Sequence, residues 1–101
     1  MTTIFREIRS YIGGNNIIHY SKIYRNDVLI AKLLPHSSEE VYKSFINTLK
    51  GIKYNSDKYP STIRGLVVFT NGKWLMHYED WDSGSTYWKI YFPCPKYEEF
   101  E

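Results

Sequence analysis

The dipeptide Asn71-Gly72 constrains the fold of this chain more than any other feature of its sequence. It stands between two apolar-alternating runs, and both residues tolerate the positive φ of a type I′ turn, so it predicts a two-residue β-hairpin. A second turn signal, Asp82-Ser83-Gly84-Ser85, precedes another strand-like run, Thr86 to Phe92. Residues 61–95 are therefore expected to form an aromatic three-stranded antiparallel meander.

A two-residue loop also fixes which residues of this hairpin face each other. The expected pairs are Phe69–Trp74, Val67–Met76 and Gly65–Tyr78. The glycine of the last pair leaves room for the tyrosine ring. The expected core face carries Ile63, Val67, Phe69, Trp74, Met76, Tyr78, Trp88, Ile90 and Phe92. The opposite, mixed face carries Arg64, Leu66, Val68, Lys73, Leu75, His77, Glu79, Tyr87, Lys89 and Tyr91.

The mixed face contains a contiguous apolar patch with charged residues around it. The patch consists of Leu66, Val68, Leu75, Tyr87 and Tyr91. A monomer seldom exposes such a patch without use. Two interpretations stay open: the N-terminal half of the domain covers the patch, or the patch is an interface with a partner.

The N-terminal half predicts a helix followed by a hairpin. Thr3 caps a short helix with one apolar face, and Gly13-Gly14 ends it. The apolar positions are Ile4, Phe5, Ile8, Tyr11 and Ile12. Strands Ile17–Tyr24 and Val28–Leu34 are favoured next, around residues 25–27, because Ile, Tyr and Val dominate there. The alternative is a short helix over 27–34, capped by Asn26 and stopped before Pro35.

A capping box predicts the second helix, with Ser37 at the N-cap and Glu40 three residues later. Apolar residues follow at helical spacing, and Gly51 is a plausible stop. They are Val41, Tyr42, Phe45, Ile46, Leu49 and Ile52. The element order is then α-β-β-α-β-β-β. We expect one α+β domain over residues 1–101, with the helices packed on one face of an antiparallel sheet.

Composition and charge narrow the class of protein. The single cysteine, Cys94, excludes an intramolecular disulfide framework, and no apolar run is long enough for a membrane span or a signal peptide, so a cytoplasmic protein is expected. Residues 1–75 hold eleven Lys/Arg and five Asp/Glu, a net of +6, and residues 76–101 hold two and six, a net of −4. This asymmetry suits a charge-complementary partner or a second copy of the chain, and it argues against both an acidic DNA mimic and a strongly basic nucleic-acid binder.

Catalysis finds little support in the sequence. His19, His36 and His77 sit in separate elements, and no serine or cysteine lies in a nucleophile motif, so we expect neither an enzyme nor a cofactor. Cys94, between two prolines, is expected to end the last strand rather than to react. His77 falls near Glu79, Asp80 and Asp82, but strand alternation separates them and no metal-site spacing is met, which favours a charged turn over a metal site.

Two further features are candidate binding sites. Trp81, in the second turn, is either a binding hot spot or a lid over the core. The most basic stretch interleaves cations with aromatic residues, which suits either a nucleotide or phosphate site or a solvated helix end. Its residues are Lys50, Lys53, Lys58, Arg64, Tyr54 and Tyr59.

The segment Gly65–Pro95 resembles the C-terminal segment of small uncharacterised phage and bacterial proteins. The shared pattern is approximately a Gly, a Val/Ile-Val-Phe run, Asn/Asp-Gly, Trp-Leu, then Glu-Tyr-Asp-Gly-Ser, an aromatic pair and a terminal Pro. It is matched by Gly65, Val67, Val68, Phe69, Asn71, Gly72, Trp74, Leu75, Trp88, Tyr91 and Pro93. The chain departs from the pattern at residues 79–85, where the turn is longer and carries Trp81. The resemblance covers about a third of the chain and implies a phage or mobile-element protein that counters host defence by binding, as anti-CRISPR proteins do.

We therefore expect a non-enzymatic binding protein that inhibits a host defence factor by protein–protein contact. The expected partner-binding residues are Trp81, Tyr87, Tyr91, Glu79, Asp80, Asp82 and His77, with the carboxylates facing a basic partner surface. The alternatives are an oligomeric sponge for a nucleotide messenger and a single-stranded nucleic-acid-binding module. No membrane association is expected.

Overall fold

A computed structural model describes residues 2–54, 63–80, 82 and 85–92, and the side chains of 79, 80 and 85 fall outside this description. Within these residues the elements are β1 (Thr2–Thr3), α1 (Ile4–Ile8), the 3-10 helix η1 (Arg9–Tyr11), β2 (Ile18–Arg25), β3 (Val28–Leu33), α2 (Glu39–Gly51), β4 (Lys53–Tyr54), β5 (Ile63–Phe69), β6 (Trp74–Asp80) and β7 (Ser85–Tyr91). None of the helices in this part of the chain has the length and apolar character needed to cross a membrane.

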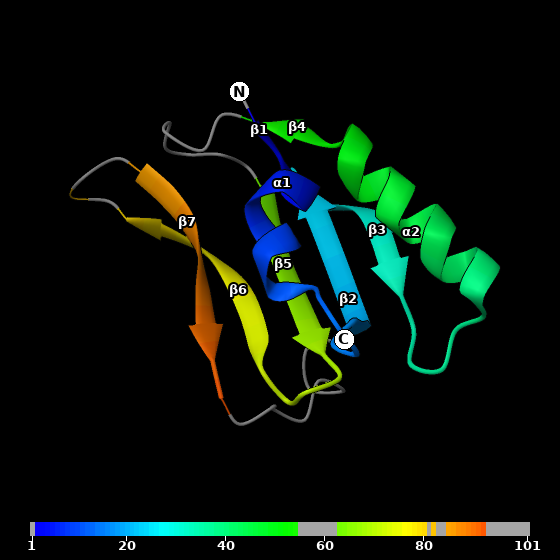
Figure 1. Cartoon of the computed structure of the whole chain (residues 1–101). Coiled ribbons are helices and arrows are strands. Elements are labelled where there is room, and N and C mark those ends of the chain that lie inside the picture. Colours follow the sequence, from blue (N-terminus) through cyan, green and yellow to red (C-terminus); the bar gives the residue numbers. More distant parts are fainter. Residues whose placement is uncertain (1, 55–62, 81, 83–84, 93–101) are drawn as a thin grey trace.

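The strands form a five-stranded sheet in the order β3-β2-β5-β6-β7, and every neighbouring pair is antiparallel. A small second sheet pairs β1 with β4. Helices α1 and α2 lie on the same side of the large sheet, with α2 running alongside β3 (Figure 1). The predicted α+β class, with helices on one face of an antiparallel sheet, is confirmed.

Hydrogen bonds at the helix starts confirm one predicted cap and correct the other. Thr3 accepts a hydrogen bond from the Arg6 N–H at 3.1 Å and begins α1 as expected. The N-cap of α2 is Ser38, whose Oγ accepts from the Val41 N–H at 3.2 Å, rather than Ser37. The Ser37 hydroxyl instead donates to the Leu34 carbonyl at 2.6 Å, so the helix begins one residue later than predicted.

The β2–β3 hairpin is formed as predicted, and it holds the type I′ turn. Asn26 and Asp27 have φ of 51° and 63°, and Arg25 pairs with Val28 across a two-residue loop. Positive φ at both central positions is the requirement of this turn, and Asn and Asp tolerate it better than most residues. The alternative helix over residues 27–34 is excluded.

The predicted type I′ turn at Asn71-Gly72 is wrong, although the hairpin is present. Its loop has three residues: the Phe69 N–H donates to the Lys73 carbonyl at 2.9 Å, and only Gly72 has a positive φ, 89°. A three-residue loop that ends in a left-handed glycine is the next commonest hairpin connection. The pairs are therefore Val68–Trp74, Val67–Leu75 and Leu66–Met76, one residue away from the predicted register.

Distant hydrogen bonds explain this longer loop. The Ile17 N–H donates to Thr70 Oγ1 at 3.1 Å and the Thr70 N–H to the Ile17 carbonyl at 2.9 Å, while the Asn71 N–H donates to Asn16 Oδ1 at 3.1 Å. The loop is thus held by the turn before β2. A slip of one residue moves every side chain of β6 to the opposite face. Trp74, Met76 and Tyr78 consequently lie outside the core face on which they were predicted.

The core lies between the helices and the sheet. Its buried members are Ile4, Ile8, Ile18, Ile23, Ala31, Leu33, Phe45, Leu49, Ile52, Tyr54, Ile63, Val67, Phe69, Leu75 and Trp88. The Trp88 Nε1–H donates to the Tyr54 hydroxyl at 3.1 Å inside this core. Gly65 allows a close approach as expected, but of other side chains: a Cβ there would lie 2.7 Å from Ile23 Cδ1 and 2.8 Å from Trp88 Cη2.

Candidate functional site

The face of the sheet opposite the helices, here called the helix-free face, carries rows of side chains that run across the strands. Residues directly opposite in antiparallel strands point to the same face, so the register of the strands defines the rows. The lysine row crosses all five strands through Lys32, Lys22, Leu66, Met76 and Lys89. On one side of it lie Tyr20, Val68, Trp74 and Tyr91, and on the other lie Tyr24 with Arg64 and Tyr78 with Tyr87.

On β6 and β7, two aromatic pairs enclose the lysine row. The rings of Trp74 and Tyr91 stack with centroids 4.5 Å apart and 22° between their planes, and those of Tyr78 and Tyr87 lie 5.2 Å apart. The Lys89 ammonium lies between the pairs, 5.4 Å from the Tyr91 centroid and 5.7 Å from that of Tyr78. We call Trp74, Tyr78, Tyr87 and Tyr91 the aromatic ladder.

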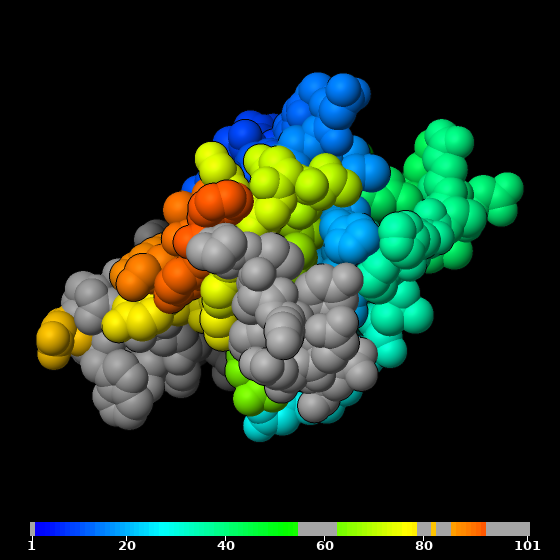
Figure 2. Space-filling model, turned by 90° about the horizontal axis from the view of Figure 1, so that it is seen from below, coloured from blue at the N-terminus to red at the C-terminus, as the bar shows by residue number. Residues whose placement is uncertain are grey.

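Part of the aromatic ladder is exposed. Tyr78 and Tyr87 are each 45% exposed and Lys89 beside them is exposed, whereas Trp74 and Tyr91 are partly buried. The space-filling view shows the atoms of β6 and β7, in yellow and orange, at one side of the molecule and those of α2 at the other (Figure 2). In the middle of the same face, Tyr20, Leu66 and Val68 are buried, and Trp74 and Met76 pack against them.

Cations dominate the opposite half of the helix-free face. A shallow pocket of about 280 Å³ is lined by Lys22, Tyr24, Arg64, Gly65, Leu66 and Met76. The Arg64 guanidinium lies 5.1 Å from the Tyr24 ring centroid and 3.7 Å from Asp27, in the exposed β2–β3 turn. The cations of this half are Lys22, Lys32 and Arg64.

Only some of the predicted partner-binding residues lie on the helix-free face. Tyr87 and Tyr91 lie on the helix-free face, and Asp82 is exposed in the turn after β6. Trp81 lies outside the described residues, as does Cys94. For Glu79 and Asp80 the structure describes the backbone, at the end of β6, but not the side chains.

His77 was predicted on the same face as Tyr87, and that prediction is wrong. The shifted register turns it toward the helices, where its Nδ1 lies 2.9 Å from the Ile63 carbonyl oxygen. Its ring packs between Tyr54 and Trp88, at centroid distances of 5.6 and 5.1 Å. His77 therefore belongs to the core rather than to a partner-binding surface.

The predicted nucleotide or phosphate site is not assembled from its described residues. Tyr54 is only 5% exposed, and burial raises its pKa to about 12, against a smaller lowering by the hydrogen bond from Trp88. Lys50 lies 5.0 Å from the Phe5 ring centroid on the helix side, whereas Arg64 lies on the helix-free face. The Lys53 carbonyl accepts a hydrogen bond from Arg25. Lys58 and Tyr59 lie outside the described residues.

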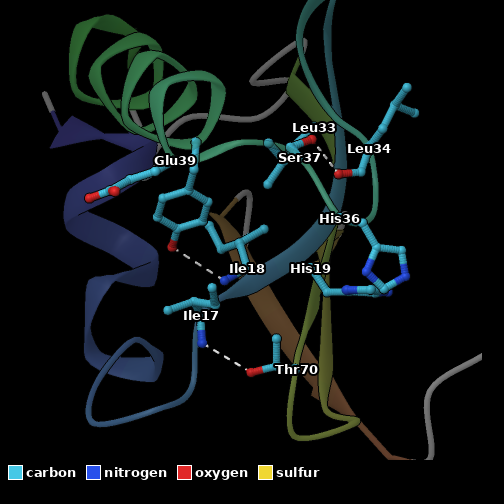
Figure 3. A pocket seen from close by; sticks show the side chains of 10 residues that line it. Ile17, Ile18, His19, Leu33, Leu34, His36, Ser37, Glu39 and Thr70 are labelled. Atoms are coloured by element: carbon cyan, nitrogen blue, oxygen red, sulfur yellow. Dashed lines mark hydrogen bonds between the residues drawn. The ribbon is translucent and has the colours of Figure 1, made fainter.

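A different concave region joins two histidines that were expected in separate elements. A cavity of about 400 Å³ at the start of α2 is lined largely by apolar side chains, and the rings of His19 and His36 meet edge to face at 5.4 Å (Figure 3). The Tyr42 hydroxyl accepts from the Ile18 N–H at 3.3 Å across it. In the described part of the chain, no three His, Cys, Asp or Glu side chains are grouped to hold a metal.

Comparisons of the chain with protein-family models, with curated proteins and with solved structures find no match. The functional assignment therefore rests on the residues of the helix-free face. Three of them, Trp74, Met76 and Tyr78, were assigned to the core by the sequence. Their alternation did signal one shared face, but only the loop length decides which face that is.

Proposed function

We propose that this chain is a non-enzymatic binding protein that holds a macromolecular partner on the helix-free face of its sheet. The observation that carries the proposal is the aromatic ladder, in which half-exposed tyrosines enclose an exposed lysine. Aromatic residues, methionine and arginine are enriched at binding surfaces, and Tyr and Trp supply large contact areas with little rotamer freedom to lose.

The architecture supports different roles for the two faces of the sheet, one in stability and one in binding. The helices and the larger buried cluster lie on one side of the sheet, so most of its stabilising contacts are made there. A rigid sheet presents its side chains with fixed spacing, which lowers the conformational cost of binding. The exposed aromatic rings on this face are then available for a partner.

The resemblance of residues 65–95 to phage and bacterial proteins supplies the biological setting of the proposal. In that setting the protein inhibits host defence, and the target is a defence effector or the complex that the effector forms. Among the described residues, the proposed contact consists of Tyr78, Tyr87, Tyr91 and Lys89. It leaves out His77, which packs in the core.

Site-specific photocrosslinking tests the proposal. p-Benzoylphenylalanine at Tyr87 should crosslink a macromolecule in a bacterial lysate, and excess untagged wild-type protein should compete with that product. The matched control places the same group at Val41 on α2, which is 50% exposed and lies on the helix side. Equal crosslinking at both positions, or a product at Tyr87 that survives competition, would refute the proposal.

A further inference from the structure

We infer that the cavity at the start of α2 binds a small, uncharged aromatic molecule that carries a hydroxyl or a similar donor–acceptor group. This inference goes beyond the proposed function, because no residue of the aromatic ladder lines the cavity. The cavity is built by the start of β2, the end of β3, the turn into α2 and the loop at Thr70 (Figure 3). Its walls join residues as far apart in sequence as Ile17 and Thr70, so no pattern along the chain predicts it.

The cavity has the size and the walls of a small-molecule site. Its volume of about 400 Å³ falls near the lower end of the range for such sites, about 300 to 1,000 Å³. Ile17, Leu33 and Leu34 supply aliphatic walls. Ile17 and Leu34 are 43% and 49% exposed. A ligand with an apolar body would remove part of this surface from water, which is favourable.

The charges around the cavity do not favour an ion. Among the lining residues only Glu39 is acidic, and none is Lys or Arg. The Glu39 carboxylate lies 3.2 Å from the Lys43 ammonium, and its side chain points away from the two histidines (Figure 3). Moving an ionised group against apolar walls without a partner costs far more than moving a neutral group there. The ligand is therefore expected to be uncharged.

Tyr42 and His36 supply the polar contacts that would orient the ligand. The Tyr42 hydroxyl accepts from the Ile18 N–H at 3.3 Å, so its own proton can be donated to a ligand. The hydroxyls of Ser37 and Thr70 already donate to other groups of the chain. A neutral imidazole has one nitrogen that accepts, so His36 complements a donor. A ligand hydroxyl both donates and accepts, which matches these two side chains.

Rings on the cavity wall favour an aromatic ligand over an aliphatic one. The rings of His19 and His36 meet edge to face, with centroids 5.4 Å apart and 83° between their planes. Tyr42 adds a third ring. Contacts between aromatic rings stabilise a complex beyond the burial of area alone. His36 also has a φ of 60°, a left-handed conformation that side chains rarely adopt and that is concentrated at functional sites.

NMR titration of the full chain tests the inference with three probes that share one tolyl ring. p-Cresol carries the hydroxyl, p-xylene replaces it with a methyl group of similar size, and p-toluate carries a negative charge. p-Cresol should bind about 3- to 10-fold more tightly than p-xylene, because buried hydrogen bonds favour it. p-Toluate should bind most weakly. The amide shifts should centre on Ile17, Leu34 and Tyr42.

Two substitutions and a matched control locate the binding site. Tyr42→Phe keeps the ring and removes the hydroxyl, so it should abolish the preference for p-cresol over p-xylene. His36→Asn should weaken p-cresol binding about 3-fold or more, and Asn still tolerates the left-handed φ. Val41→Ala, next to Tyr42 on α2 but outside the cavity wall, should leave binding unchanged. The melting temperature of each variant reports whether it folds.

Several results would overturn the inference. They are equal binding of p-cresol and p-xylene, tighter binding of p-toluate, amide shifts centred away from the cavity, or no shift up to the solubility limit of the probes. Equal effects of His36→Asn and Val41→Ala would overturn it as well. None of these results bears on the crosslink at Tyr87, so the proposed function stands or fails separately.

Discussion

The two faces of the five-stranded sheet use aromatic residues in opposite ways. On the helix-covered face, Trp88 is 9% exposed and its indole nitrogen bonds Tyr54 inside an aliphatic core. On the helix-free face, Tyr78 and Tyr87 are each 45% exposed, and the Lys89 ammonium lies 5.7 Å from the Tyr78 ring centroid. The same residue class therefore stabilises one face and equips the other for contact.

Strand β6 contributes side chains to both faces, and neighbouring residues in it differ in burial. Leu75 is fully buried under the helices, while its neighbours Trp74 and Met76 pack on the other side. The aromatic content of the sequence, 18%, says nothing about this division. The register decides which rings are structural and which are available.

Substitutions of Trp88 and Trp74, one on each face, should give the largest difference in the free energy of unfolding. Trp88→Ala should destabilise the fold by about 3 to 5 kcal/mol, because it empties a core position. Trp74→Ala should cost only about 1 to 2 kcal/mol, since this partly buried ring loses its stacking on Tyr91 and its contact with the Tyr20 cluster. Urea unfolding measures both.

Trp88→Phe keeps the prediction testable if Trp88→Ala does not fold. It retains an aromatic ring but removes the hydrogen bond to Tyr54, so its loss should fall between those of the two alanine variants. Equal losses for Trp88→Ala and Trp74→Ala would show that the two faces do not differ in this way.

The stability of the fold at alkaline pH should depend on Tyr54, which is buried on the helix-covered face. Burial raises the pKa of Tyr54 to about 12, while an unfolded tyrosine titrates near 10. Above about pH 10 the unfolded chain loses this proton first, so stability is full below that pH and falls by about 2 to 3 kcal/mol as pH rises to 12. Tyr54→Phe should lack this component. Urea unfolding at pH 8, 10 and 11 should therefore show a wild-type advantage that shrinks with pH, and a constant difference would contradict the burial.

Alanine substitutions at two glycines, Gly65 and Gly51, should change the stability of the fold in opposite directions. Gly65→Ala should cost about 1 to 3 kcal/mol, because the new Cβ would lie under 3 Å from Ile23 and Trp88. Gly51→Ala, at the end of α2 with open space around it, should gain up to about 1 kcal/mol from helix propensity. Thermal unfolding of both variants checks this, and a neutral Gly65→Ala would mean that the core face is looser than the structure shows.

Local sequence predicted the elements well where local interactions determine them. The β2–β3 hairpin, the helix after Ser38, the closing meander and the α+β class all follow from patterns within a few residues. The β6 register did not, because it depends on two hydrogen bonds between residues more than fifty positions apart in sequence. The Ile17 N–H donates to Thr70, and Asn16 accepts from the Asn71 N–H. The cap of α2 shifted for a similar reason, since the Leu34 carbonyl binds the Ser37 hydroxyl.

The candidate site was predictable only in part for the same physical reason. Tyr87, Lys89 and Tyr91 were placed on their correct face because β7 alternates as expected. Trp74 and Tyr78 were predicted on the core face but lie on the helix-free face, and His77 was predicted on the opposite face but lies in the core. The row of lysines exists only across strands, so no pattern along the chain could show it.

The two hairpin turns differ in which residues have a positive φ, and the smallest expected effect comes from Asp27→Gly. Asp27→Gly creates Asn-Gly at a turn where both residues have positive φ, so it should stabilise the fold by about 0.5 to 1 kcal/mol, less a small loss for the exposed pair with Arg64. Gly72→Ala should instead cost about 1 to 2 kcal/mol, because φ there is +89°. Urea unfolding measures both variants. A destabilising Asp27→Gly would mean that Asp27 does not adopt the positive φ of this turn, and a neutral Gly72→Ala would mean the same of Gly72.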